Sequence, residues 1–244
     1  MSLAGKTAVV TGAAGAVGLA VVRAFLEDGM QVALVDLDAM RLDSLVRFLR
    51  GPTLAVACDV SEPGAVRQAQ RQVEKVLGPI DVLVNAAATA SIERFESTTD
   101  DEWRRVMGCN VDGAFYWCRA VLAGMRTRGF GRIVNVGSIA AKTGAGQGAA
   151  FAASKGALDA LTFALARECA GQGITVNAVA PAFVKTTAVV EMNDAQRRHL
   201  LAQIPAGRFC EPEEVAHAVR YLVSPLAGFV TGEVMDVNGG YHMD

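Results

Sequence analysis

The sequence predicts an α/β fold: one doubly wound parallel sheet of about seven strands with helices on both faces. Two observations support this prediction. Short runs of four to eight residues, apolar on both faces and rich in β-branched side chains, recur along the 244-residue chain. Segments with a helical apolar period separate them, and several end in glycine. This alternation is typical of parallel strands joined by right-handed helical crossovers.

The clearest strand segments follow one another in chain order. They are TAVVTG (7–12), QVALVD (31–36), TLAVACDV (53–60), DVLVNAA (81–87), GRIVNVGS (131–138) and ITVNAVAP (174–181), with a further strand at VMDV (234–237). The clearest helical segments are VGLAVVRAFLEDG (17–29), PGAVRQAQRQVEKVLG (63–78), the single long segment 101–129, SKGALDALTFALARECAGQG (154–173) and EEVAHAVRYLVS (213–224).

Length and composition favour a single domain over residues 1–244. The chain is 52% hydrophobic and 20% charged, which is enough apolar material for a sizeable core without disordered tracts. A more polar insert at about 185–210 follows the sixth strand. An insert at a strand's carboxyl end is where a substrate lid is expected, and a pair of surface helices without such a role is the alternative.

The charge balance and the cysteines narrow the possible partners and the location. A net charge of -2 gives no reason to expect nucleic acid or an anionic membrane as a partner. The five cysteines are far apart and show no metal-binding spacing, so no metal site is predicted. No signal peptide precedes the first strand. These features indicate a cytoplasmic protein with reduced thiols.

The turn after the first strand, TGAAGAVGLA (11–20), has the composition of a dinucleotide-binding turn. Glycines let backbone amides approach a pyrophosphate at a helix N-terminus, although close packing alone also selects them. Asp36 ends the second strand at the separation expected for an acid that binds the adenosine ribose and repels a 2′-phosphate. This favours NAD(H) over NADP(H), with Asp38 as a competing acid. The third and fourth strands bring Asp59, Val60 and Asn85 to the same edge.

These motifs, in this order, resemble the short-chain dehydrogenase/reductase family over nearly the whole chain, and in particular its bacterial acyl-carrier-protein ketoreductases and secondary-alcohol dehydrogenases. The family's glycine turn matches Thr11 through Gly18, its NNAG motif matches Asn85 through Ala88, and its PGxxxT motif matches Pro181 through Thr186. The resemblance implies a Rossmann fold and an NAD site formed by Gly12, Gly15, Val17, Gly18, Asp36, Leu37, Asp59, Val60, Asn85, Ala86, Ala87, Lys155, Pro181, Val184 and Thr186.

The same resemblance implies a catalytic group of Asn110, Ser138, Phe151 and Lys155. In the family a tyrosine phenol exchanges a proton with the substrate oxygen while hydride moves to or from the nicotinamide. The lysine lowers the phenol's pKa and binds the nicotinamide ribose, the serine polarises the oxygen, and the asparagine holds a relaying water. Here the family's YxxxK motif is FAASK (151–155), so the ring is kept and the hydroxyl is missing. A strand cap, a helix hydrogen bonder and a solvated charge are the ordinary alternatives for the serine, asparagine and lysine.

Other departures are milder. Alanine replaces a family glycine or asparagine at Ala16, Ala86, Ala88 and Ala182. An added methyl group narrows the crevice without closing it. Tyr116 is not expected to replace the missing phenol, because its spacing from the helix asparagine places it on another face.

The predicted function is NAD(H)-dependent hydride transfer between the nicotinamide and a small secondary alcohol or ketone, impaired by Phe151. Three interpretations remain open. Phe151 is an engineered change in a working enzyme, or it is natural in an enzyme whose unusual substrate supplies its own acid or needs none. In the third, the chain is a non-redox protein that only binds NAD(H). Restored activity in Phe151→Tyr, activity without it, and binding without turnover would distinguish them.

The sequence predicts the oligomeric assembly and the walls of the substrate site less precisely than it predicts the cofactor site. Apolar stripes run along two long helices, and the resemblance implies a four-helix homodimer interface there and a homotetramer through the C-terminal strand. Core packing is the alternative for any one of these residues. The stripes are Val106, Cys109, Phe115 and Cys118 on one helix and Leu158, Leu161, Ala164 and Leu165 on the other. Substrate walls are expected from 89–98, 139–150 and 183–210.

Overall fold

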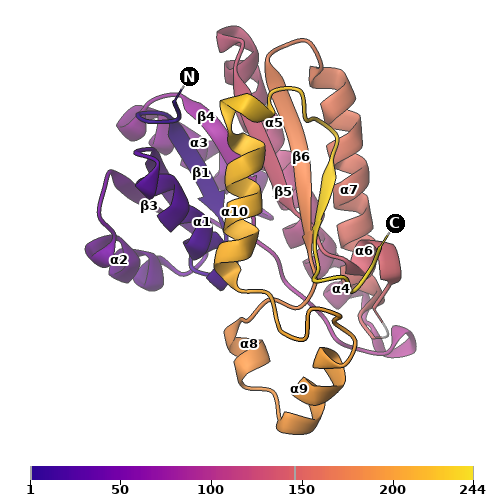
Figure 1. The fold of residues 1–244 in the computed structure, drawn as a ribbon. Helices are drawn as coiled ribbons and strands as arrows, with labels where there is room; N and C mark the ends of the chain where they lie inside the picture. Colours follow the sequence, from indigo (N-terminus) through magenta and orange to yellow (C-terminus); the bar gives the residue numbers. More distant parts are fainter. Residues whose placement is uncertain (1, 146, 244) are drawn as a thin grey trace.

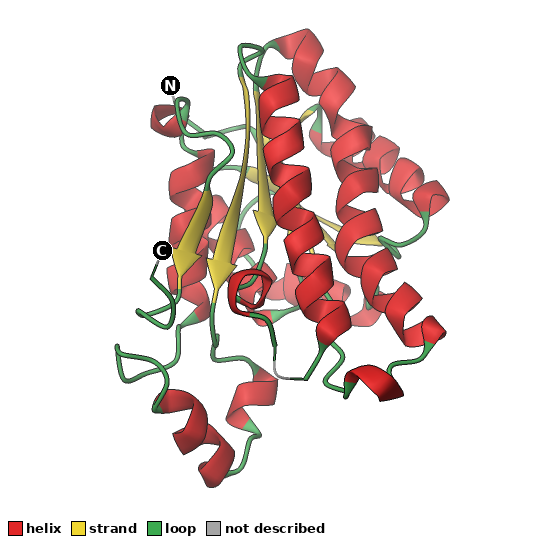
Figure 2. Cartoon of the chain, turned by 90° about the vertical axis from the view of Figure 1, so that its right-hand side faces the viewer, coloured by secondary structure: helices red, strands yellow, loops and turns green. Residues whose placement is uncertain are grey.

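A computed structural model describes residues 2–145 and 147–243, so Gly146 of the expected substrate loop 139–150 lies outside the described residues. Its strands form one parallel sheet in the order β3-β2-β1-β4-β5-β6-β7, with helices on both faces (Figure 1). Figure 2 shows the same layers from the side. The predicted fold class is therefore confirmed.

The strands and helices have the following bounds. The strands are β1 (Thr7–Thr11), β2 (Gln31–Asp36), β3 (Thr53–Ala57), β4 (Ile80–Asn85), β5 (Gly131–Val136), β6 (Ile174–Pro181) and β7 (Val234–Val237). The helices are α1 (Ala16–Glu27), α2 (Ala39–Phe48), α3 (Pro63–Leu77), α4 (Asp100–Met107), α5 (Gly113–Arg128), α6 (Ala140–Thr143), α7 (Ala149–Cys169), α8 (Thr187–Val190), α9 (Asp194–Leu201) and α10 (Pro212–Val223). Three short turns are η1 (Phe95–Ser97), η2 (Gly108–Asp112) and η3 (Pro225–Ala227).

Two apolar cores lie on the two faces of the sheet. Side chains alternate along each strand, so that Val10 and Leu34 pack with α1 and α10, whereas Val9 and Val35 pack with α3 and α5. Strands that are buried on both faces need continuous apolar runs, which is why the sequence shows them as unbroken blocks. The cores fix the strands in register and bring their carboxyl ends to one edge.

Several predicted boundaries are wrong by a few residues. The predicted third strand runs to residue 60, but the ladder ends at Ala57. Cys58 and Val60 stay buried beyond it, so the apolar run continues although the pairing has stopped. In α2, which the sequence shows only faintly, Leu42 is the one fully buried residue.

The predicted continuous helix 101–129 is interrupted. α4 ends at Met107, a π-helical turn covers η2, and α5 then begins at Gly113. A Cβ atom on Gly113 would lie 2.8 Å from Val60 Cγ2, so the helix passes unusually close to the loop that follows β3. A π-turn inserts an extra residue into a helix and is frequent at functional sites.

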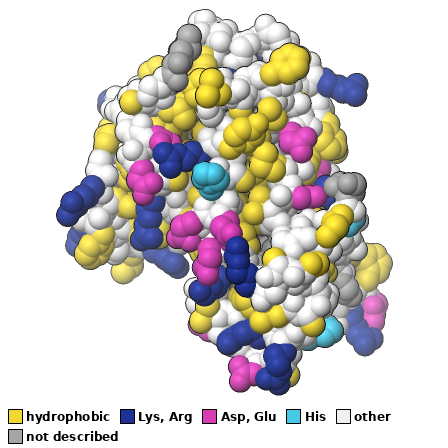
Figure 3. Space-filling view, viewed as in Figure 1, with side chains coloured by type: hydrophobic (Ala, Val, Ile, Leu, Met, Phe, Trp, Pro, Cys, Tyr) yellow, Lys and Arg dark blue, Asp and Glu magenta, His cyan; other side chains and the backbone are white. Residues whose placement is uncertain are grey.

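The polar insert forms α8 and α9, which project beyond the carboxyl ends of the strands at the bottom of Figure 1. On the face shown in Figure 3, acidic and basic side chains lie intermingled. α7 is long and apolar enough to pass a simple test for membrane spans, but core helices of globular proteins pass it too, and α7 packs against β6 and α6.

Candidate functional site

The glycine turn between β1 and α1 brings two backbone segments into close approach. Gly12 has a φ of 63°, and a Cβ atom there would lie 2.7 Å from the carbonyl oxygen of Ala86. A Cβ atom on Gly18 would lie 2.2 Å from the carbonyl oxygen of Gly12. Gly15, by contrast, has a φ of -77° and caps α1 with ordinary backbone geometry. A Cβ atom on Gly15 would lie 3.2 Å from the Gly12 carbonyl oxygen, so the steric demand for glycine is weaker there than at Gly12 and Gly18.

The alanines that depart from the family motifs fit without backbone strain. No residue other than glycine has a positive φ in the described part of the chain, so a methyl group is tolerated at all four positions. Thr11 Oγ1 accepts hydrogen bonds from the backbone N–H groups of Ala86 and Ala87, both at 3.1 Å. The end of β1 thereby fixes the loop that leaves β4.

The side chains of the two candidate ribose acids, Asp36 and Asp38, make different hydrogen bonds. Asp36 Oδ2 accepts a hydrogen bond from the backbone N–H of Ala14 at 3.0 Å, which ties the acid to the glycine turn. Asp38 Oδ1 accepts from the backbone N–H of Arg41 at 2.9 Å and caps α2. Of the two acids, Asp36 is therefore the one whose side chain contacts the glycine turn.

A cavity of about 420 Å³ lies between the glycine turn, the ends of β2 and β3, the loop after β4 and η2. Six residues predicted for the cofactor line it: Gly12, Asp36, Leu37, Asp59, Val60 and Ala87. The remaining lining residues were not predicted for the cofactor, although Thr89 falls in the expected substrate wall 89–98: Cys58, Ser61, Ala88, Thr89, Arg104, Arg105, Gly108 and Cys109. Several of these residues adjoin a predicted motif residue in the sequence. In contrast, α4 has no motif that points to Arg104 or Arg105.

The other predicted cofactor residues lie outside this cavity's lining: Gly15, Val17, Gly18, Asn85, Ala86, Lys155, Pro181, Val184 and Thr186. Asn85 is 5% exposed, and its Nδ2 donates to Asn135 Oδ1 at 2.9 Å, so its side chain points into the protein. The carbonyl of Pro181 accepts from the backbone N–H of Ile139 at 3.0 Å, which joins the ends of β6 and β5.

Asn110 lies in η2 and links three elements. Its Oδ1 accepts from the backbone N–H of Thr89 at 2.8 Å, and its Nδ2 donates to the Thr89 carbonyl and to Ser154 Oγ, both at 2.9 Å. Ser154 Oγ donates in turn to the Phe151 carbonyl at 2.7 Å. The side-chain amide of Asn110 is thus hydrogen-bonded to protein groups, and it joins the loop after β4 to the first turn of α7.

Lys155 is buried beside the end of β5. Its side chain is 3% exposed, and Nζ donates to the Val136 carbonyl at 2.7 Å. Burial lowers the pKa of Lys155 to about 8, against the opposing effects of Cys109 and Asp159. Nζ lies 5.6 Å from the centroid of the Phe151 ring, so ring and ammonium share one face of α7.

Ser138 follows Val136 by two residues and lies at the same strand end. Its Oγ accepts from the backbone N–H of Ala140 at 3.2 Å, which leaves the hydroxyl hydrogen available to a ligand. Asn110, Ser138, Phe151 and Lys155 are therefore gathered where β5, η2 and α7 meet.

The three tyrosines of the chain contact other groups. The Tyr116 ring lies 5.5 Å from the Phe115 ring, and Tyr221 is 49% exposed. The Tyr241 hydroxyl donates to Gln203 Oε1 at 3.4 Å. In none of these contacts does a phenol reach Ser138 or Lys155.

Known proteins share this architecture. The family model described as enoyl-(acyl carrier protein) reductase matches residues 12–242. The chain is 36% identical over 243 residues to the 3-oxoacyl-[acyl-carrier-protein] reductase of Vibrio cholerae, covering 100% of both chains. It is 39% identical over 244 residues to the galactitol 2-dehydrogenase (L-tagatose-forming) of Cereibacter sphaeroides, covering 98% of this chain and 96% of that protein. The crystal structure of gox2181 superposes with a TM-score of 0.95 at 33% identity, covering 98% and 96% of the two chains.

Proposed function

Because the chain belongs to the short-chain dehydrogenase/reductase family of oxidoreductases, we propose that it transfers hydride between NAD(H) and a small secondary alcohol or ketone. One observation carries the proposal: Lys155 binds the Val136 carbonyl at the end of β5, two residues before Ser138, on the sheet edge where the cavity and the glycine turn also lie. A crevice at the carboxyl ends of parallel strands is where open α/β sheets bind ligands.

The residues at this edge fit a dinucleotide. Gly12 and Gly18 leave no room for side chains, so backbone amides at the start of α1 can contact a pyrophosphate. Asp36, already oriented by Ala14, would bind the adenosine ribose, and the cavity beside it would hold the base. When bound, NAD(H) supplies or accepts the hydride.

The protein's own groups act on the substrate oxygen. Ser138 donates a hydrogen bond to that oxygen through its free hydroxyl hydrogen. Lys155 binds the nicotinamide ribose with its ammonium group. Phe151 has no phenol to give, so we propose that in ketone reduction the substrate oxygen receives its proton from Lys155 through a water molecule. Its pKa of about 8 keeps most of the lysine protonated at neutral pH, which makes this route available but slow.

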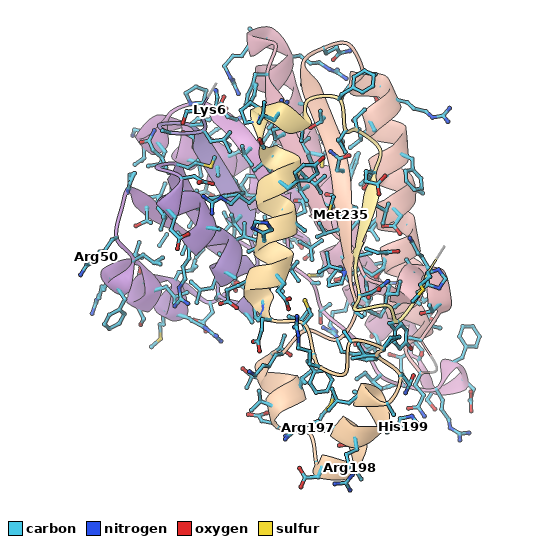
Figure 4. The ribbon with its side chains drawn as sticks, in the orientation of Figure 1. Lys6, Arg50, Arg197, Arg198, His199 and Met235 are labelled. Carbon is cyan, nitrogen blue, oxygen red and sulfur yellow. The ribbon has the colours of Figure 1, made fainter. Side chains whose placement is uncertain are left out.

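A free alcohol or ketone fits the surroundings better than a carrier-bound or coenzyme A thioester. A phosphopantetheine arm carries a phosphate that a group of unpaired cations would hold. Two cations at the ends of the insert are paired with acids: Lys185 with Glu211 at 2.9 Å, and Arg208 with Glu214 at 2.6 Å. The labelled group Arg197, Arg198 and His199 lies on α9 at the lower end of the molecule in Figure 4.

We also propose a homodimer or homotetramer built on the α5–α7 surface. Core packing accounts for Val106, Cys118 and Leu158, which are at most 2% exposed within the chain. Phe115 is 40% exposed and borders a hollow of about 290 Å³ between α5 and α7. An exposed aromatic beside an apolar hollow is typical of a subunit contact.

All five cysteines are free thiols, which supports the prediction of a cytoplasmic location.

The cofactor proposal is tested by titrating the protein with NADH and NADPH and recording nicotinamide fluorescence. We expect saturable NADH binding and NADPH binding at least about 10-fold weaker, because the Asp36 carboxylate repels a 2′-phosphate. Asp36→Asn should weaken NADH binding by about 10-fold or more, since charge-assisted hydrogen bonds to the ribose are lost. Asp38→Asn keeps the α2 cap and serves as the matched control, with unchanged affinity. No saturable binding of either nucleotide would contradict the proposal.

A further inference from the structure

A buried acid on α7, Asp159, lies close to the proposed catalytic lysine, Lys155. Asp159 follows Lys155 by one helical turn on α7, so the two side chains share a face of the helix. Asp159 is 8% exposed, and its Oδ1 atom is buried without a hydrogen-bond partner among the described residues. A buried carboxylate oxygen without a partner is costly, so its presence calls for an explanation.

Asp159 and Lys155 contact neighbouring residues at the end of β5. The ammonium group of Lys155 donates to the Val136 carbonyl. A Cβ atom on the next residue, Gly137, would lie 3.2 Å from Asp159 Oδ1, so the carboxylate packs against this glycine. Ser138 comes next in the chain. The lysine and the buried acid therefore contact Val136 and Gly137, the two residues that precede Ser138.

We propose that Asp159 is a positioning residue whose buried negative charge keeps Lys155 protonated, so that the lysine can act as the proton donor in the absence of a phenol. The inference rests on the proposed function of Lys155. Its physical basis is simple: an opposite charge nearby stabilises an ammonium ion that burial would otherwise neutralise. Without a tyrosine at position 151, the rate depends directly on how much of Lys155 carries the proton.

The other charged groups around Asp159 come from two further elements. Lys142 on α6 and Asp236 on β7 form an ion pair at 2.9 Å, and both contribute to the field at Asp159. Burial raises the pKa of Asp159 to about 6, and Asp236 acts in the same direction, whereas Lys155 and Lys142 oppose it. Asp159 is thus mostly ionised at pH 7 and mostly neutral at pH 5. Cys109 of η2 is the remaining group that acts on Lys155.

NMR of protein labelled with ¹³C at lysine Cε measures the proton on Lys155 directly. The chain has few lysines to resolve: Lys6, Lys75, Lys142, Lys155 and Lys185. Lys142→Arg and Lys155→Arg assign the two buried signals. In the unmodified, cofactor-free protein we expect Lys155 to titrate near pH 8 and to show a smaller inflection near pH 6, where Asp159 gains its charge.

Asp159→Asn should remove the inflection near pH 6 and raise the ratio of neutral to protonated Lys155 at pH 7 by about 10-fold, which corresponds to a fall of about one unit in the Lys155 pKa. Asp159→Glu keeps the charge and should restore the inflection. The control is Asp43→Asn, an exposed acid on α2, which should leave the titration unchanged. An identical Lys155 titration in Asp159→Asn and in the unmodified protein would overturn the proposal.

Two features keep this test separate from the proposed function. The titration needs neither cofactor nor substrate, so a failure to bind NADH would refute the function without affecting the charge coupling. Adding NADH to the same sample tests the proposed cofactor site through a shift of the Lys155 signal. If Asp159→Asn does not fold, as judged by loss of dispersed methyl signals, the inflection in the unmodified protein decides alone: its absence would overturn the proposal.

Discussion

At the scale of single residues, the proposed catalytic group differs from the one that the family resemblance implies at one oxygen atom, the phenol hydroxyl that Phe151 lacks. Phe151 keeps its ring beside the Lys155 ammonium, and its carbonyl still accepts from Ser154. The link from Ser154 to Asn110 is also intact. The phenol of the family's tyrosine is missing, while the groups proposed to orient the substrate and the nicotinamide ribose remain.

The pH dependence of carbonyl reduction follows from this arrangement. If Lys155 supplies the proton, the active form is the ammonium, which predominates below its pKa of about 8. We expect the rate of ketone reduction by NADH to be level from pH 6.5 to 7.5 and to fall about tenfold per unit well above pH 8. NADH affinity, measured at each pH, serves as the control. A rate that stays constant to pH 10 would exclude Lys155 as the donor.

Individual residues also show what a sequence pattern does not predict. The end of a strand indicates which edge a residue reaches but not which way its side chain points, because successive side chains alternate between faces. Asn85 was predicted at the crevice, yet its amide is bound inside by Asn135. Asp36 and Asp38 could be separated only once the start of α2 was known, because the second acid is its cap.

At the scale of elements, the strands and most helices could be predicted because their apolar periods are strong. The interruption at η2 could not be predicted, since a π-turn changes one hydrogen-bond register without changing the apolar pattern. α4 lines the cavity through Arg104 and Arg105, although its sequence carries no binding motif. These features depend on tertiary contacts that are not local in the sequence.

The insert containing α8 and α9 gives a prediction at this scale. Asn193 Oδ1 accepts from the backbone N–H of Gln196 at 2.9 Å in a capping box at the start of α9. Asn193→Ala should destabilise α9 by about 1 kcal/mol and speed its amide hydrogen exchange about fivefold. If the insert is a lid, KM for the ketone should rise while NADH affinity stays unchanged.

The control is Ser224→Ala, which removes the cap of η3 at the far end of α10. It should leave both KM and exchange in α9 unchanged. An unchanged KM in Asn193→Ala, despite faster exchange in α9, would favour the simpler view that the insert is a pair of surface helices.

At the scale of the whole molecule, the proposed α5–α7 contact predicts an oligomer that one charge can disrupt. Phe115→Asp places a carboxylate in an apolar contact, where an unpaired charge is costly, so we expect a shift toward monomer in light scattering coupled to size exclusion. Phe48→Asp is the matched control, because Phe48 is 86% exposed on α2, away from this surface. An unchanged mass in Phe115→Asp would place the subunit contact elsewhere.

The central claim is that the chain holds a dehydrogenase site in which only the phenol of the family's tyrosine is missing, so that Lys155 is a slow substitute donor. The most direct measurement compares ketone reduction by NADH in the unmodified chain and in Phe151→Tyr, over one panel of ketoses and simple ketones. The account predicts a rise of about 10²- to 10⁴-fold in rate with NADH affinity unchanged. Equal rates in the two proteins would contradict it, whether both turn over the ketone or neither does.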